Sequence, residues 1–237
     1  LHQRSRWPQL VIHRPSLTRL PADFAVPLLC GPVRGRLRRP PELTILLVHD
    51  RAKPTIAEQA LHYCGIDDYI LVQPPPGTPW RNTCKLRLMA DWLARDCDTE
   101  YVLYVDSDDA VIRDQPARAI DYLREANADL LFSDTAFVGG YRCMPGVRRW
   151  VDDRSRAAGR SRCYLNSGVF VGRSSFLAEV LDAALAWVTD NDLGRAEFFE
   201  LMFAGKLCDR LADFPRGSGS DQEILRYLQP RFHPRMQ

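Results

Sequence analysis

Short runs of apolar residues recur along the chain, and between them apolar residues return every three or four positions. The runs at 43–48 (LTILLV) and 101–105 (YVLYV) carry no charge, which is typical of strands covered on both faces. Further strands are predicted at 69–72, 130–132 and 164–171. Helices are predicted between the strands, at 57–64, 84–95, 117–125 and 176–188. This alternation predicts a three-layer α/β fold with a mostly parallel central sheet.

The connecting segments are interpreted from the residues that break regular structure. Gly65 is expected to end the helix at 57–64. The Pro-Pro-Pro-Gly run at 74–77 marks a loop. The arginine-rich stretch before the strand at 164–171 is also expected to be a loop.

Composition restricts the class of protein. With 237 residues and 46% hydrophobic residues, the chain fits one large domain or a domain plus an arm. No apolar run approaches the ~18 residues that span a bilayer, so no membrane span is expected. No secretory signal is visible at the start of the chain, and a cytoplasmic location is therefore expected.

The beginning of the chain differs in charge from the rest. Residues 1–40 hold eight arginines against a single acid, Asp23, and six prolines interrupt them. Such an arm can bind nucleic acid, but it lacks interleaved aromatic residues, and a solvated extension or a packing strap is favoured. Residues 1–41 are therefore predicted to form a basic arm, and residues 42–237 the main domain.

Seven cysteines are scattered without any C-x-x-C pair, so a zinc finger or a thioredoxin-type motif is not expected. The odd number does not suggest a disulfide framework. Reduced, mostly buried thiols are the interpretation that we adopt, in agreement with a cytoplasmic protein.

Three carboxylates follow the apolar run at 101–105 almost directly, namely Asp106, Asp108 and Asp109. In open α/β sheets, ligands bind beyond the carboxyl ends of strands, where these side chains are expected to lie. Carboxylate oxygens suit Mg²⁺ or Mn²⁺ shared with a substrate phosphate. The alternative is that the acids cap the following turn or remain solvated.

Other common catalytic motifs are absent from the sequence. It contains no G-x-x-x-x-G-K-[ST], no G-x-G-x-x-G after a strand, no H-E-x-x-H and no G-x-S-x-G. Its five histidines are dispersed, so a histidine-based triad or zinc centre has little support.

Five sequence blocks, taken in order, resemble a known family. The blocks are CKLRLMADWL, YVLYVDSDDAVI, LLFSDTAF, RCYLNSGVFVG and SDQEILRYL, and they span roughly residues 43–237. They resemble the glycosyltransferase domain of lysyl hydroxylases and the related collagen-type glycosyltransferases, which have the GT-A (Rossmann-like) fold. The resemblance implies transfer of a sugar from a nucleotide sugar, UDP-glucose or UDP-galactose, to a hydroxyl acceptor.

The resemblance also implies a metal site. The family motif D-S-x-D falls on Asp106, Ser107 and Asp109, so the two aspartates would hold Mn²⁺ (or Mg²⁺) against the donor diphosphate. Asp108 would supplement them or contact the nucleotide. A cation at this position stabilises the negative charge that develops on the departing diphosphate.

Donor-binding residues follow from the same resemblance. Lys85 would lie near the donor, and Asn166, Ser167 and Gly168 would lie beside the sugar. Trp80 can stack on the uracil or on a sugar ring. The alternatives left open are a solvated cation for Lys85, a bulge within a strand for residues 166–168, and a packing anchor for Trp80.

Near the end of the chain, Asp221 and Gln222 match the family's D-D-Q, with Ser220 in place of the first acid. Asp221 is the candidate catalytic base, or it caps the next helix. The family's late His-x-Asn-Gly segment has no counterpart, so the domain is expected to be truncated at its C-terminal end. His233 is expected to be an ordinary loop histidine.

Two further hypotheses remain beside a metal-dependent glycosyltransferase. The D-S-D-D segment also resembles the nucleophile loop of haloacid-dehalogenase-type phosphohydrolases, in which Asp106 would act as a covalent nucleophile. The chain can also be an inactive glycosyltransferase-like binding protein. The segment 194–216 looks longer than its family counterpart, and a helical lid or an acceptor-specific insertion is expected there.

Overall fold

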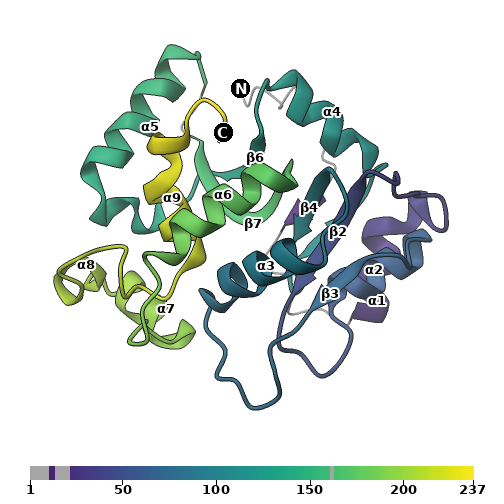
Figure 1. Ribbon diagram of the computed structural model, residues 1–237, viewed down its shortest axis with the longest axis horizontal. Helices are drawn as coiled ribbons and strands as arrows, with labels where there is room; N and C mark the ends of the chain where they lie inside the picture. The colour runs from purple at the N-terminus through teal and green to yellow at the C-terminus, as the bar shows by residue number, and fades with distance from the viewer. Residues whose placement is uncertain (1–10, 14–21, 161–162) are drawn as a thin grey trace.

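The computed structural model describes residues 11–13, 22–160 and 163–237 of the chain. At its centre lies a five-stranded sheet with the order β3-β2-β4-β7-β6 (Figure 1). The strands are β2 (Leu43–Val48), β3 (Ile70–Val72), β4 (Tyr101–Val105), β6 (Leu130–Thr135) and β7 (Tyr164–Arg173). Only β7 runs against its neighbours, so the predicted, mostly parallel sheet is confirmed.

Helices cover both faces of this sheet. Alternate residues of β2 and β4 point to opposite faces, as the pleat requires, and enter two separate hydrophobic cores. One core is closed by α1 (Ala22–Cys30), α2 (Ile56–Cys64) and α4 (Ala117–Glu125). The other is closed by α3 (Cys84–Arg95), α6 (Ser174–Leu185) and α9 (Asp221–Phe232). The predicted three-layer fold is thereby confirmed.

Helix α2 shows how local sequence sets the limits of an element. The side chain of Thr55 accepts a hydrogen bond from the amide of Glu58, whose carboxylate accepts one from the amide of Thr55 in return. At the other end, Gly65 has φ 92°, a left-handed conformation that costs glycine little. The predicted end of this helix is confirmed.

The sequence pattern missed several elements. The predicted basic loop before β7 contains the 3₁₀ helix η3 (Gly139–Cys143) and helix α5 (Pro145–Ala157), so that prediction was wrong. Val151 is the one buried residue of α5, and this helix is rich in charged residues, so it resembles a polar loop in the sequence. The other missed elements are α1, β1 (Val11–His13), η2 (Gly31–Val33) and β5 (Ala110–Ile112). Two short helices, α7 (Arg195–Phe203) and α8 (Leu207–Arg210), lie in the segment where a helical lid or an insertion is expected. Strands β1 and β5 pair in a small antiparallel sheet.

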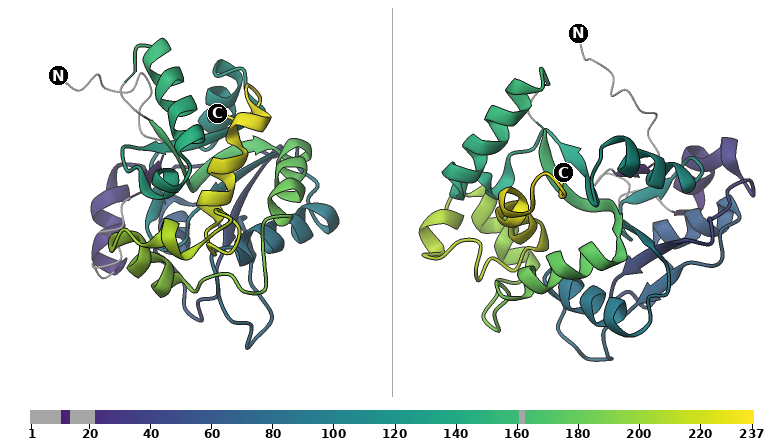
Figure 2. Two further views of the ribbon diagram at one scale, coloured as in Figure 1. Left: turned by 90° about the vertical axis from the view of Figure 1, so that its left-hand side faces the viewer. Right: turned by 45° about the horizontal axis from the view of Figure 1, so that its top comes forward.

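Helices α5, α7, α8 and α9 gather beyond strands β6 and β7, on the opposite side of the molecule from α1 and α2 (Figures 1 and 2). The segment 194–216 contains α7 and α8, so its expected helical character is confirmed. Its role as a lid or insertion remains a prediction. In the described part of the chain, no helix is long and apolar enough to cross a membrane.

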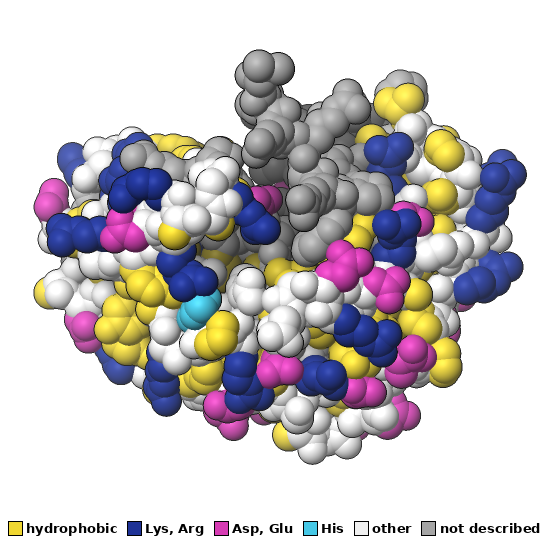
Figure 3. Space-filling view, turned by 90° about the horizontal axis from the view of Figure 1, so that it is seen from above, with side chains coloured by type: hydrophobic (Ala, Val, Ile, Leu, Met, Phe, Trp, Pro, Cys, Tyr) yellow, Lys and Arg dark blue, Asp and Glu magenta, His cyan; other side chains and the backbone are white. Residues whose placement is uncertain are grey.

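Part of the predicted basic arm packs onto the main core. Ala25, Cys30 and Leu37 are buried in the same cluster as β2 and β4, as the packing-strap alternative expects. Four of the arginines (4, 6, 14 and 19) lie outside the described residues. Among the others, Arg39 pairs with Asp68. The face seen in Figure 3 carries Lys and Arg interspersed with Asp and Glu, with no large field of one sign.

Two of the cysteines form a disulfide, Cys143–Cys208, which joins η3 to α8. The prediction of reduced thiols was therefore wrong for this pair, whose partners are 65 residues apart and could not be matched from spacing. Cys30, Cys64, Cys84 and Cys97 are free thiols. Disulfides are rare in cytosolic proteins, so this disulfide argues against a cytoplasmic location. The location itself remains a prediction.

Candidate functional site at the carboxyl edge of the sheet

The ends of β2, β4 and β6 and the beginning of β7 meet at one edge of the sheet. Because β7 is antiparallel to β4, its first residues lie where β4 ends, and Val105 is opposite Val169. Beyond that pair, the amide of Asp106 donates to the carbonyl oxygen of Gly168 at 2.7 Å. The structure thus brings the predicted acidic segment and the predicted N-S-G turn together.

Strand β7 bulges at this turn. Its pairing with β6 passes from Phe132↔Phe170 directly to Ser133↔Asn166, so residues 167–169 have no counterpart on β6. The side chain of Asn166 accepts a hydrogen bond from the amide of Gly168 at 2.9 Å. The bulge left open as an alternative is therefore present, and it is also what aims Ser167 away from the regular ladder toward α9.

Lys85, in the first turn of α3, reaches the acidic segment. Its Nζ lies 3.1 Å from Asp106 Oδ2, and its side chain is 11% exposed. Burial by itself lowers the pKa of the Lys85 ammonium, but the negative charge of Asp106, assisted by Tyr104 and Asp221, outweighs it and raises the pKa well above the usual value. Lys85 therefore stays charged, and the alternative of a solvated cation is wrong.

Asp221 and Gln222 lie on the other side of the bulge, at the start of α9. Ser167 Oγ donates to Asp221 Oδ2 at 3.0 Å, and the Ser167 amide donates to Gln222 Oε1 at 3.3 Å. The helix cap is Ser220, whose side chain accepts from the Glu223 amide, so Asp221 is the first residue of the helix rather than its cap. Asp221 is buried and close enough to influence Lys85.

Asp108 has different partners from those that the sequence predicted. Arg51, in the loop after β2, donates to both of its carboxylate oxygens at 2.7 and 3.4 Å. Arg195, at the start of α7, lies 3.9 Å from Asp108 Oδ2. Sequence reasoning missed both arginines, since they are 144 positions apart and belong to none of the five blocks.

Ser107 and Asp109 complete the turn between β4 and β5. The Ser107 carbonyl accepts from the amide of Ala57 at 3.1 Å, which ties the turn to α2. Ser107 is 1% exposed, and its hydroxyl oxygen makes no hydrogen bond within the described residues. A buried polar atom without such a bond is expected where a ligand completes the site.

A divalent cation bound at this turn would need oxygen atoms from a bound ligand in addition to the carboxylates of the protein. Within the described residues, no group of three or more His, Cys, Asp or Glu side chains is arranged to hold a metal. Mg²⁺ is usually bound by one or two carboxylates together with substrate phosphates. Asp106 and Asp109 are the candidates for those carboxylates. The metal remains a prediction, with Asp108 already engaged by arginine.

Two other candidates lie outside this group of residues. Trp80 is partly buried and packs against the core beneath α3 and α6, as the packing alternative expects. His233 follows the last residue of α9, a helix of 12 residues, and packs edge-on against Trp150. A helix of that length separates His233 from Asp221 by about 18 Å, so it is an ordinary loop histidine, as expected.

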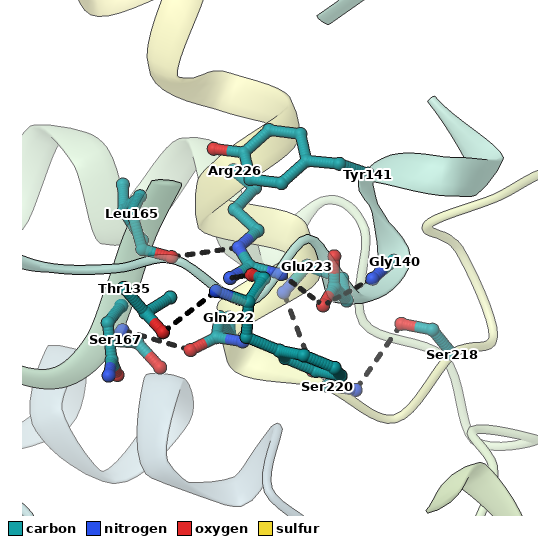
Figure 4. Close-up of polar contacts among 12 residues, drawn as sticks. Thr135, Gly140, Tyr141, Leu165, Ser167, Ser218, Ser220, Gln222, Glu223 and Arg226 are labelled. Atoms are coloured by element: carbon teal, nitrogen blue, oxygen red, sulfur yellow. Dashed lines mark hydrogen bonds and ion pairs between the residues drawn. The ribbon is translucent and has the colours of Figure 1, made fainter. Parts of the chain in front are cut away.

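A second polar cluster lies in the interior, where α9 meets β7 and η3, and sequence reasoning did not find it (Figure 4). Arg226 of α9 is fully buried and pairs with Glu223 at 2.9 Å. Its Nε donates to the Leu165 carbonyl at 2.8 Å, and its guanidinium lies 4.6 Å from the centre of the Tyr141 ring. The pair holds α9 against β7 and η3.

Glu223 accepts a further hydrogen bond from the Gly140 amide at 3.3 Å. A Cβ atom at Gly140 would lie 2.3 Å from Glu223 Oε2, so only glycine permits this approach. Burial raises the pKa of Glu223, while the neighbouring Arg226 opposes that shift. An i, i+3 Glu–Arg pair on a helix normally indicates a solvated face, which is why the sequence concealed this cluster.

Comparison with known proteins adds little to this geometry. No protein-family model matches the chain, and no curated protein matches it in sequence. Among solved structures, the chain is similar to the crystal structure of a glycosyltransferase involved in the glycosylation of the major capsid of PBCV-1. The two share 17% identity, the alignment covers 83% of this chain and 81% of that one, and the TM-score is 0.41. A likeness of this degree assigns no function.

Proposed function

We propose that this chain is a metal-dependent glycosyltransferase that moves a sugar from a UDP-sugar, UDP-glucose or UDP-galactose, to a hydroxyl acceptor. The observation that carries the proposal is the convergence of Lys85, Asp106, Ser167 and Asp221 at the carboxyl edge of a mostly parallel sheet. Ligands of such sheets bind at that edge.

The proposed roles follow from the chemistry of each side chain. Asp106 and Asp109 would hold Mn²⁺ or Mg²⁺, which supplies positive charge to the departing diphosphate when it is bound. The buried ammonium of Lys85 fixes the orientation of the Asp106 carboxylate. The hydroxyl of Ser167 and the amide groups of Asn166 and Gln222 are neutral groups suited to sugar hydroxyls.

Asp221 is the proposed base that accepts a proton from the acceptor hydroxyl. It lies in the first turn of α9, directly after the Ser220 cap, and is buried. The hydrogen bond from Ser167 sets the orientation of that carboxylate beside the bulge.

Asp106→Asn tests the metal site directly. The amide keeps the size of the side chain but loses the charge that binds a cation, so we expect Mn²⁺-dependent transfer or UDP-sugar hydrolysis to fall at least about 100-fold. The measurement is UDP release from UDP-glucose and UDP-galactose, with thermal unfolding to verify that the variant folds. Asp91→Asn, on the exposed face of α3, is the matched control.

Two outcomes would overturn the proposal. If Asp106→Asn turns over at the parent rate, the metal assignment is wrong. If the parent protein releases phosphate from p-nitrophenyl phosphate and no UDP from either sugar donor, the haloacid-dehalogenase alternative replaces the glycosyltransferase.

A further inference from the structure

Two arginines from distant parts of the chain approach one carboxylate beside the candidate site. Arg51 Nη2 lies 2.7 Å and Arg195 Nη1 lies 3.9 Å from the same oxygen, Asp108 Oδ2. All three side chains are partly exposed, with 47%, 50% and 28% of the side chains of Arg51, Arg195 and Asp108 accessible. Asp108 thus faces two positive charges that water and solutes can reach, and Asp50 and Asp106 also lie close enough to act on Arg51.

The backbone beneath Arg51 is fixed, so that only its side chain is left to move. Its amide donates to Nδ1 of the buried His49 at 3.0 Å, and its carbonyl accepts from Gln73 at 2.9 Å. Because Nδ1 of His49 accepts, its other ring nitrogen carries the proton and donates to Glu58 at 3.0 Å. The loop that carries Arg51 is therefore anchored to α2.

The backbone beneath Arg195 is anchored as well. Asp192, three residues earlier, is buried and accepts a hydrogen bond of 2.8 Å from the hydroxyl of Thr83. Thr83 precedes α3, which carries Lys85 in its first turn. The start of α7 and the start of α3 are thus joined through the interior, which keeps Arg195 beside the same edge of the sheet as Lys85.

We propose that Arg51 and Arg195 form a clamp for the diphosphate group of the ligand, with Asp108 as the internal counter-anion that the diphosphate replaces. This proposal rests on the proposed function, because the diphosphate is that of the UDP-sugar donor. Guanidinium groups present their donors in a planar fork that matches phosphate oxygens. Partly exposed ion pairs are weak, so a diphosphate with more than one negative charge displaces the single carboxylate of Asp108.

The experiment measures binding of UDP and of inorganic pyrophosphate by titration calorimetry, with EDTA and then with Mn²⁺. Arg51→Gln and Arg195→Gln each remove one charged donor, and we expect the Kd of both probes to rise about 10- to 100-fold. Arg210→Gln, an exposed arginine of α8 in the same segment, is the matched control and should bind like the parent.

The direction in which Asp108→Asn changes the affinity for the two probes decides between two roles for Asp108. If Asp108 competes with the ligand for the two arginines, its neutralisation tightens binding in EDTA by about 3-fold. If Asp108 is instead a metal ligand or a contact to the nucleotide, the same substitution weakens binding. Arg51→Lys and Arg195→Lys retain the charge without the fork, and intermediate losses are expected from them.

The proposal is overturned if either Gln variant binds both probes like the parent, if Asp108→Asn weakens binding, or if the parent binds neither probe. Failure of the proposed function is separate, because it is measured as sugar transfer. A protein that binds UDP with the expected pattern of variants but transfers no sugar would retain the clamp and lose the glycosyltransferase assignment.

Discussion

Two of the Arg–carboxylate clusters in the described part of the chain differ in how far they are exposed to solvent. In one, Arg226 and Glu223 are 0% and 1% exposed, and the arginine also binds the Leu165 carbonyl and the Tyr141 ring. In the other, Arg51 and Asp108 are 47% and 28% exposed. In the first cluster, neither water nor another ion can reach the pair. In the second cluster, the exposed side chains are accessible to a ligand.

This difference separates structural charges from charges available for binding. A buried ion pair is strongly destabilising to break, because removal of one partner leaves an uncompensated charge in the interior. An exposed pair contributes about 0–1 kcal/mol to stability and exchanges partners readily. We therefore interpret Arg226 and Glu223 as structural charges, whereas ligand binding is our proposal for Arg51, Arg195 and Asp108.

The largest expected effect comes from Arg226→Met. It leaves Glu223 buried without its counter-charge, and we expect the free energy of unfolding to fall by about 3–5 kcal/mol. For a chain of this length, that corresponds to a melting temperature lower by about 6–20 °C. The measurement is thermal unfolding followed by circular dichroism.

The double variant Arg226→Met with Glu223→Met is the control for that change. Since neither charge remains in the interior, it should recover part of the lost stability. A single variant within about 1 kcal/mol of the parent would show that the cluster is open to water, and the contrast between the two clusters would disappear.

The second effect concerns the disulfide that joins α8 to η3, next to Gly140 of the buried cluster. Replacement of both Cys143 and Cys208 by serine should lower the free energy of unfolding by about 2–4 kcal/mol, because the bond closes a long loop. Chemical denaturation of the parent and the double variant measures it. Cys84→Ser, at a free thiol of intermediate exposure, is the control, and an equal loss there would contradict the assignment.

The smallest stability effect is expected at the exposed cluster. Arg51→Gln should change the free energy of unfolding by no more than about 1 kcal/mol. The same variant is expected to weaken diphosphate binding, so it separates stability from binding in one protein. A loss as large as that of Arg226→Met would place Arg51 among the structural charges.

Much of the candidate site could be predicted from short-range pattern. Asp106 directly follows an apolar run, which predicts its place at the end of a strand. Residues 166–168 came from the family resemblance, with a bulge within a strand as the alternative. Lys85 and Asp221 came from the family resemblance, and the structure brings both to the same edge. The arginines 51 and 195 were not predicted, because nothing in their local sequence distinguishes them from the other arginines of the chain.

By itself, the sequence determined the five strands of the central sheet, the helices α2, α3, α4 and α6, and the placement of acids after β4, since periodicities of 2 and 3.6 residues are local properties. Tertiary structure alone decided which charge meets which. Asp108 accepts a hydrogen bond from Arg51, 57 positions away in the sequence, and Cys143 forms a disulfide with Cys208, 65 positions away. Partner choice of this kind depends on the packing of α7, α9 and the sheet, which fixes distance and burial and leaves no periodic trace in the chain.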